Sequence, residues 1–239
     1  MTNKVLVAFA MKQEFAPWRR RHGFHRVSTS PSLIWMSSFD GTEVYVGLVG
    51  AGAVEAGHLR NLVAQYQPSA GIVTGVAAGL KPDWRPGDVL VPRTVCAPDG
   101  KVRVAGDARL IDLAVQCGAR RADTLVTLPR IVRTVAEKER LASIAEAADM
   151  ESLPLLDLWS SSGIPAVALR VVLDPVEMPM TCDFEAAMDP HGQVRITKIL
   201  AELARHPGLL PDFLHLARQS GRVMRILARF LDRYIVAMK

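Results

Sequence analysis

The stretch Ala166-Val-Ala-Leu-Arg-Val-Val-Leu173, followed at once by Asp174, is the most apolar predicted strand in the sequence. Strands that are apolar on both sides are typical of sheets whose two faces are covered by helices. Further short apolar runs alternate with helical patterns, and these predicted strands are Val5–Ala10, Leu33–Ser37, Val44–Val49, Gly71–Gly75, Asp88–Val91 and Leu125–Leu128. The sequence therefore predicts an α/β fold in which a central mixed, twisted sheet has helices on both faces.

Helical spacing of apolar residues marks several segments between these strands. One helix is predicted after Gly52, where one face is shared by Val54, His58, Leu59, Leu62 and Val63. Two more are predicted, over Ala136–Ala147 and from about Glu151. From about Gln193 onward every pattern is helical, with breaks expected at Pro207-Gly208 and Ser220-Gly221. We predict a single domain over residues 1–239, made of an α/β core (1–190) and a helical C-terminal extension (191–239).

The composition excludes several classes of protein. Of the 239 residues, 49% are hydrophobic and 22% charged, which is a globular balance and not that of a disordered or fibrous chain. Three widely spaced cysteines without zinc-site spacing indicate a reducing compartment and no metal. No apolar run reaches the ~18 residues of a membrane span, and Lys4–Ala10 is interpreted as a buried strand and not as a secretion signal. We expect a cytoplasmic protein, whose net charge of +5 permits an anionic partner without requiring nucleic acid.

Three carboxylates stand at places where open α/β sheets bind their ligands. Glu14 lies beyond the first strand, Glu151 opens a helix, and Asp174 ends the most apolar strand. Partial burial of Asp174 would raise its pKa and let it donate a proton near neutral pH. Any one of these acids alone is explained as well by a helix cap or an ion pair. Together they suit cleavage of a glycosidic bond.

Two glycine-rich turns offer another kind of site. Val49–Gly57 follows a strand and opens a helix, but its GxGxxxxG spacing departs from the dinucleotide-binding GxGxxG. No acidic residue lies near position 70 to hold a ribose, and the next one is Asp83. The second turn, Thr74–Leu80, has small residues that let the flat face of a ligand approach the backbone, although close helix–sheet packing needs them as well. No cofactor is predicted.

Taken in order, these segments resemble the purine nucleoside phosphorylase and nucleosidase superfamily, in particular the 5′-methylthioadenosine/S-adenosylhomocysteine nucleosidases. The matching pieces run over most of residues 4–185 and are Ala10-Met11-x-x-Glu14, Gly50-x-Gly52-x-Val54, Thr74-Gly75-x-Ala77-x-Gly79-Leu80, Gly87-Asp88-Val89, Asp149-Met150-Glu151 and Arg170-x-x-x-Asp174. Three segments, 149–152, 170–175 and 205–218, also look like the hopanoid-associated branch, which removes adenine from adenosylhopane.

The resemblance implies roles for individual residues. Glu14 matches the carboxylate that orients and deprotonates the attacking water, and Asp174 matches the acid that protonates adenine N7. Glu151 matches the acid that holds the ribose hydroxyls, with Met150 packed beneath the sugar. The other substrate-binding residues that we predict are Val76, Ala77, Gly79, Ile131 and Val132.

Departures from the family pattern bear on the nucleophile. Val76 stands where the phosphorylases and many nucleosidases carry a hydroxyl, and Leu173 replaces a usual serine. No clear arginine pair matches a phosphate clamp, for which the candidates are Arg19, Arg20 and Arg60. We therefore predict a nucleosidase that uses water to release adenine from a 5′-substituted adenosine, namely adenosylhopane, in hopanoid biosynthesis. The alternatives are a phosphorolytic enzyme, a methylthioadenosine-type nucleosidase for a soluble substrate, and a non-catalytic nucleoside-binding protein.

The C-terminal extension leaves three interpretations open. Its last helix carries several arginines beside an apolar stripe from Val223 to Tyr234. Such a helix can lie on a membrane surface, pack on the core or on a partner subunit, or line the pocket for an apolar part of the substrate. By analogy with relatives that associate, we expect a homodimer. The membrane interpretation would place the protein peripherally at the inner membrane surface.

Overall fold

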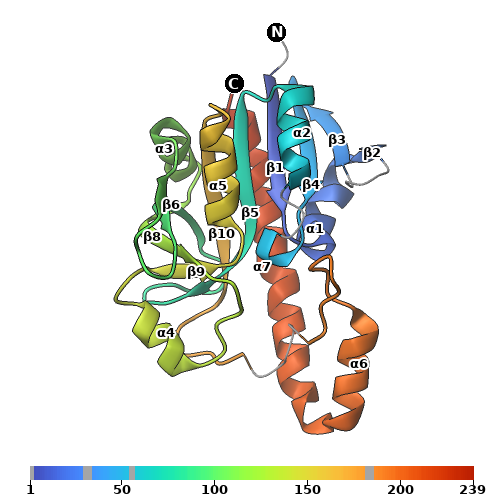
Figure 1. The fold of residues 1–239 in the computed structure, drawn as a ribbon. Helices are drawn as coiled ribbons and strands as arrows, with labels where there is room; N and C mark the ends of the chain where they lie inside the picture. Colours follow the sequence, from blue (N-terminus) through green and yellow to red (C-terminus); the bar gives the residue numbers. More distant parts are fainter. Residues whose placement is uncertain (1–2, 29–33, 54–56, 181–185) are drawn as a thin grey trace.

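In the part of the chain that the structure describes, strands and helices alternate as far as Asp174 and only helices follow (Figure 1). The structure is a computed structural model that describes residues 3–28, 34–53, 57–180 and 186–239. Its strands are β1 Asn3–Phe9, β2 His25–Ser28, β3 Ile34–Phe39, β4 Thr42–Leu48, β5 Ala70–Gly79, β6 Val89–Cys96, β7 Arg103–Ala105, β8 Arg120–Thr127, β9 Ala147–Asp149 and β10 Ala166–Asp174. Its helices are α1 Lys12–His22, α2 Gly57–Tyr66, α3 Ala108–Gln116, α4 Val135–Leu141, α5 Ser152–Ser161, α6 Ile196–Arg205 and α7 Leu210–Ala237, with the short 3-10 helices η1 Ala51–Ala53 and η2 Pro207–Leu209.

The strands form one mixed sheet with the order β10-β6-β8-β9-β5-β1-β4-β3-β2, and β7 pairs with β6. Strand β1 is parallel to both β4 and β5. Strand β10 is parallel to β5 and antiparallel to β6, so that β5, β10, β6, β8 and β9 close into a ring. The mixed sheet confirms the predicted fold class. Its parallel strands β1, β5 and β10 bring their carboxyl ends to one edge.

Helices cover both faces of the sheet, as the doubly apolar strands predict. Along β1, Val5 and Val7 pack with buried residues of α1, α3 and α7. The alternate residues Leu6 and Ala8 pack with those of α2 and α5. Because successive side chains of a strand point to opposite faces, each central strand supplies both halves of the core.

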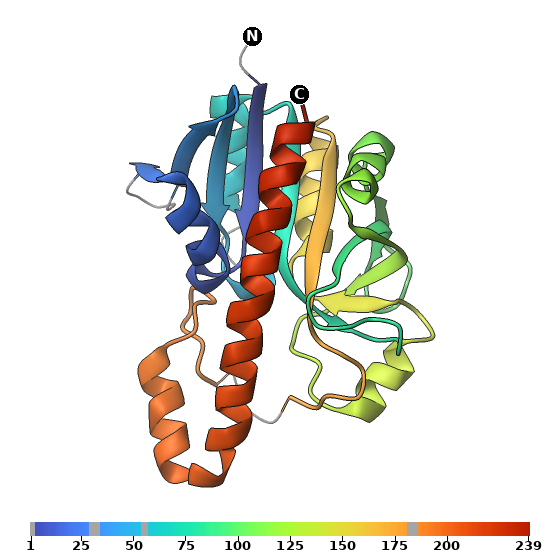
Figure 2. The same ribbon diagram turned by 180° about the vertical axis from the view of Figure 1, so that it is seen from behind.

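The C-terminal extension has two parts. Helix α6 and the first half of α7 form a hairpin that projects from the body, while the second half of α7 runs along the sheet (Figure 2). Val223, Phe230 and Tyr234 are buried there, so this stripe packs on the core. The break expected at Ser220-Gly221 is absent, because α7 is one helix of 28 residues. Burial of the stripe outweighs the roughly 1 kcal/mol that an internal glycine costs.

Other differences from the sequence-based expectations concern element boundaries. The predicted helix Ala136–Ala147 ends at Leu141, and Ala147 begins β9 instead. The Glu146 backbone bonds to Thr124 O and Leu80 N, which fixes this segment beside the sheet. Helices α1 and α3 were not predicted. Two predicted positions, Leu33 and Val54, lie outside the described residues. Among the helices in the described ranges, none combines the length and apolar character that crossing a membrane requires.

Candidate active site

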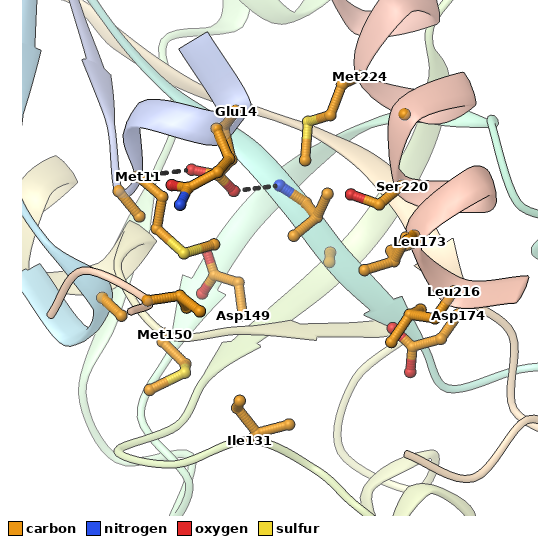
Figure 3. Close-up of a pocket in the computed structure, with 18 of the residues that line it drawn as sticks. Met11, Glu14, Ile131, Asp149, Met150, Leu173, Asp174, Leu216, Ser220 and Met224 are labelled. Carbon is orange, nitrogen blue, oxygen red and sulfur yellow. Dashed lines mark hydrogen bonds between the residues drawn. The ribbon is translucent and has the colours of Figure 1, made fainter. Parts of the chain in front are cut away.

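A cavity of about 750 Å³ lies where the carboxyl ends of β1, β5 and β10 approach α7. Glu14, Glu151 and Asp174 are far apart in the sequence, yet all three line this cavity and all are buried. Figure 3 shows Glu14 on one side of the cavity and Asp174 across from it, with Met150 and Ile131 along the floor of the view. The fold therefore brings the three predicted carboxylates around one hollow.

Glu14 is held in the first turn of α1 by backbone donors. Met11 N donates to its Oε2 at 3.0 Å and Val76 N donates to its Oε1 at 3.1 Å. Burial raises the pKa of Glu14, and the nearby Arg170 and these backbone bonds oppose the rise. Gly75 makes this approach possible, because a Cβ there would lie 2.7 Å from both Glu14 Oε1 and Arg170 Nη1.

Arg170, in the middle of β10, is the cation at the centre of the site. Its side chain is 1% exposed, and Nη2 lies 2.6 Å from Asp149 Oδ2 and 3.3 Å from Glu151 Oε2. Nε and Nη2 also donate to Ser152 Oγ at 3.2 and 3.1 Å. Nη1 is buried without a hydrogen-bond partner among the described residues. The guanidinium thus offsets several acids that would otherwise be buried together.

Glu151 stands at the N-cap position of α5, where its side chain makes no capping hydrogen bond and lines the cavity instead. Gly52 N donates to its Oε1 at 3.0 Å. Burial raises the pKa of Glu151 to about 7; Arg170 opposes the rise, while Asp149 and Glu14 add to it. Near neutral pH this group is therefore able to accept or to donate a hydrogen bond, which suits contact with hydroxyls.

Asp174 ends β10 beside a buried lysine. Lys138 Nζ, on α4, lies 2.5 Å from Asp174 Oδ2. Burial raises the pKa of Asp174 to about 6, and the charge and hydrogen bond of Lys138 oppose the rise. The direction of this pKa shift agrees with the expectation from the sequence, whereas Lys138 was not predicted as part of the site. No role was predicted for Arg170 or Asp149 either, although both stand in the quoted motifs.

Most of the other predicted binding residues also line the cavity. These are Val76, Ala77, Ile131, Val132 and Met150. Gly79 is different, because it does not line the cavity and a Cβ there would lie 3.0 Å from Trp84 Cβ. Its small size therefore serves packing. Of the three arginine candidates, Arg20 lines the cavity, Arg19 lies over the Trp35 ring at 4.7 Å, and Arg60 is exposed and does not line it.

Part of the cavity wall is apolar. It comes from the C-terminal hairpin and the segment before it, through Met180, Met188, Val194, Ile196, Ile199, Phe213, Leu216 and Ala217. Both halves of α7 contribute lining residues, from Phe213 to Arg229, whereas its stripe from Val223 to Tyr234 packs mostly on the core. Arg20, Arg21, Arg225 and Arg229 also contribute to the lining. The cavity thus combines buried acids with an apolar wall and several arginines.

The glycine-rich turn at Gly50 and Gly52 supports this site by packing. A Cβ on Gly50 would lie 2.2 Å from His191 O, so the turn and the 191–192 backbone lie against each other. Gly52 then presents its N–H to Glu151. Over the described ranges, no group of three His, Cys, Asp or Glu side chains is placed to hold a metal ion.

Sequence and structure comparisons place this chain in a known family. The family model described as the phosphorylase superfamily matches residues 4–205. The chain belongs to this superfamily. Among solved structures, it is similar to the futalosine hydrolase of Helicobacter pylori strain 26695, with 17% identity over 98% of each chain and a TM-score of 0.76. It is also similar to the 5′-methylthioadenosine/S-adenosylhomocysteine nucleosidase of Campylobacter jejuni, with 15% identity over 99% of each chain and a TM-score of 0.75. No match was found among curated protein sequences.

These comparisons confirm the superfamily and the fold that the sequence motifs predict. The prediction of a nucleosidase agrees with the names of the similar structures, which are those of nucleosidases and of a hydrolase. At identities of 15–17% these likenesses establish the architecture. The substrate must be argued from the cavity itself.

Proposed function

We propose that this chain is a nucleosidase that hydrolyses the N-glycosidic bond of a 5′-substituted adenosine and releases adenine. The observation that carries the proposal is one cavity that is lined by Glu14, Glu151 and Asp174 and also by the apolar side chains of the C-terminal hairpin. The best candidate substrate is adenosylhopane, an adenosine that carries a large hydrocarbon at its 5′ position. Hydrolysis of this compound would be a step of hopanoid biosynthesis, which agrees with the sequence resemblance described above.

The proposed chemistry assigns one task to each acid. Glu14 orients the attacking water and takes its proton, and Glu151 holds the ribose hydroxyls over Met150. Asp174 gives a proton to adenine N7, which makes the base a neutral leaving group. The sugar becomes oxocarbenium-like in the transition state, so nearby carboxylates stabilise charge that is largest at that point. Proton transfer of this kind contributes about 10²–10⁴-fold to the rate.

Water is favoured over phosphate as the nucleophile. Val76 offers only its backbone N–H to this part of the site, and that group already donates to Glu14. Arg170 is the buried guanidinium nearby, and it is engaged by Asp149, Glu151 and Ser152. A phosphate placed beside Val76 would therefore face the Glu14 carboxylate, and Arg170 would offer it only Nη1, a single donor and not a bidentate clamp.

The first experiment measures base release. The purified protein is incubated with a long-chain 5′-alkyladenosine, with methylthioadenosine, and with inosine plus phosphate, and free base is measured. Adenine from the long-chain compound at a much lower KM than from methylthioadenosine supports the proposal. Equal use of both adenosines contradicts the large apolar substrate, ribose-1-phosphate as product contradicts hydrolysis, and no release from any compound contradicts the enzyme.

Two neighbouring positions on α6 supply a matched control for the apolar wall. Ile199 lines the cavity, whereas the adjacent Leu200 is 58% exposed and is not part of the lining. Ile199→Asn is expected to raise KM for the long-chain compound and to leave KM for methylthioadenosine unchanged. Leu200→Asn is expected to change neither value, because it introduces no polar group into the cavity. Equal effects of both substitutions would contradict a binding role for the hairpin.

A lipid-linked substrate also gives the hairpin a second task, namely peripheral contact with a membrane. Its outer surface exposes Leu200, Leu210 and Leu214, at 58%, 45% and 40%. Exposed arginines follow on α7, and they suit anionic lipid headgroups. We expect the protein to float with vesicles that contain phosphatidylglycerol, and the double variant L210N/L214N to lose this binding. Equal flotation of the variant would contradict membrane contact through the hairpin.

A further inference from the structure

A buried lysine stands behind the carboxylate that we assign as the acid. Lys138 is 0% exposed. Its Nζ donates to Asp174 Oδ2 at 2.5 Å, to Pro175 O at 2.7 Å and to Met178 O at 2.8 Å. A lysine ammonium has three N–H donors, whereas the neutral amine has two. Three oxygen acceptors around one nitrogen therefore match the charged form.

We propose that Lys138 is the positioning residue of the acid step: it holds Oδ2 of Asp174, keeps Oδ1 for the transferred proton, and neutralises the carboxylate that the transfer leaves behind. This inference rests on the proposed function. In the step, the electron pair of the glycosidic C–N bond goes to the base and the Oδ1 proton moves to N7. The attacking water forms the new C–O bond and gives a proton to Glu14. Exchange with solvent then returns Asp174 to its acid form and Glu14 to its carboxylate.

The placement of the charge explains why a buried cation would favour this reaction. Before the step, Lys138 faces a neutral carboxylic acid, and after it the ammonium faces a carboxylate at the same 2.5 Å contact. Attraction between the two groups therefore grows as the proton leaves. Interactions that are stronger in the transition state than in the ground state raise kcat. Because both groups are buried, such an interaction is also weakly screened.

Other groups around Asp174 do not supply this charge. On α4, the neighbouring Glu137 pairs with Arg130 at the surface. From α7, the uncharged Gln219 donates to Leu173 O. Arg170 acts on Glu14 and Glu151, and among the described residues Lys138 is the charged group that acts on the Asp174 carboxyl. Removal of its charge should therefore change the titration of Asp174 and leave the opposite side of the cavity unchanged.

A structural role is the alternative, because Lys138 also ties the 175–178 segment to α4. The experiment compares Lys138→Met with Thr134→Ala, which removes the cap hydrogen bond from Glu137 N to Thr134 Oγ1 in the same helix and leaves the ammonium in place. Release of adenine from the best substrate is followed from pH 5 to 10 for wild type and both variants. If Lys138→Met does not fold, Lys138→Gln replaces it, since an amide keeps donors for the carbonyl oxygens without the charge.

The expected result is a shift of the alkaline limb of the pH profile of kcat, the pH range in which kcat falls as Asp174 loses its proton. Loss of the adjacent cation should move that limb upward by about 1–3 pH units. At pH values below that limb, where kcat no longer depends on pH, kcat should also fall, with KM little changed. The fall should not exceed the about 10²–10⁴-fold that loss of the acid itself costs. Thr134→Ala should leave the limb in place and Lys138→Arg should restore it. In an Asp174→Asn background, Lys138→Met should have no further effect on kcat.

Two results would overturn the inference while the nucleosidase proposal stands. One is a Lys138→Met enzyme that turns over with the wild-type alkaline limb, and the other is the same shift in Thr134→Ala. If wild type releases no base from any adenosine, the proposed function itself fails, and this outcome is distinct because it does not involve the variants.

Discussion

Replacing Arg170 by glutamine tests the electrostatic argument for the whole site. The guanidinium is 1% exposed and lies 2.6 Å from Asp149 and 3.3 Å from Glu151. Removing one partner from a buried ion pair costs about 3–5 kcal/mol, because the remaining charge is left without compensation. For a domain of this size, about 2–4 °C is lost per kcal/mol, so Tm should fall by about 6–20 °C. The exposed pair Arg121–Asp112 is the control, and Arg121→Gln should cost at most about 1 kcal/mol.

The loss should depend on pH with a defined sign. Burial raises the pKa of Glu151 and of Glu14 in the folded state, and Arg170 opposes both shifts. Without Arg170 both pKa values rise further. The folded variant therefore binds protons more strongly than the unfolded chain over a wider range of pH. A group of this kind favours folding at low pH and loses that contribution as the pH rises through its folded pKa. The stability lost in Arg170→Gln should therefore be smaller at pH 5 than at pH 8.

Denaturant unfolding at these two pH values measures the effect, with the m-value as a check that the same transition is followed. The double variant Arg170→Gln/Glu151→Gln should recover part of the loss, by about 0.5–3 kcal/mol, since the amide removes one of the carboxylates that are left without the guanidinium. An equal loss at pH 5 and pH 8, or no recovery in the double variant, would refute the view that Arg170 compensates buried carboxylates.

Three further substitutions test separate parts of the structure. Asp174→Asn should lower adenine release by about 10²–10⁴-fold and also lower Tm, because Lys138 loses its buried charged partner; near-normal turnover would remove this residue from the mechanism. Gly75→Ala should lower both Tm and turnover, because Gly75 has a φ of +149° and a Cβ there would lie 2.7 Å from Glu14 and Arg170; wild-type values would contradict the close approach. Asp107→Ala removes the cap bond to Leu110 N and should cost about 1 kcal/mol in denaturant unfolding without changing kcat.

The sequence pattern predicts the fold where the physical signal is local. Strands such as β1 and β10 are apolar on both sides, and burial on both faces of the sheet follows directly. The helix predicted to continue to Ala147 fails because the backbone bonds of Glu146 to Thr124 and Leu80 depend on the completed sheet. Such long-range pairing leaves no periodicity in the segment itself. The continuous α7 was missed for a similar reason, since the packing that tolerates Gly221 is tertiary.

The acids of the candidate site are recognisable because each follows a strand or opens a helix and stands in a motif. The cations that lie against these acids are harder to recognise in the sequence. Arg170 lies inside a strand that is apolar on both sides, and this signal of a buried charge was not used, whereas Lys138 lies in a short polar-looking helix and does not differ in sequence from a surface charge. Only the folded arrangement shows that both side chains are buried against carboxylates. Gly79 was predicted to bind substrate because it stands in a ligand-binding motif, but its small size serves packing against Trp84.

The long helix α7 divides its length between two environments, since one part packs on the core and the other belongs to the hairpin with α6. The acids stand at the sheet edge and on helices that begin there, whereas many of the apolar cavity residues belong to the hairpin. Under the proposed function, substitutions in the hairpin should change which 5′ substituent is accepted while the reacting groups keep their geometry. For protein engineering, libraries confined to residues 195–217 should then yield altered chain-length preference on an intact catalytic scaffold.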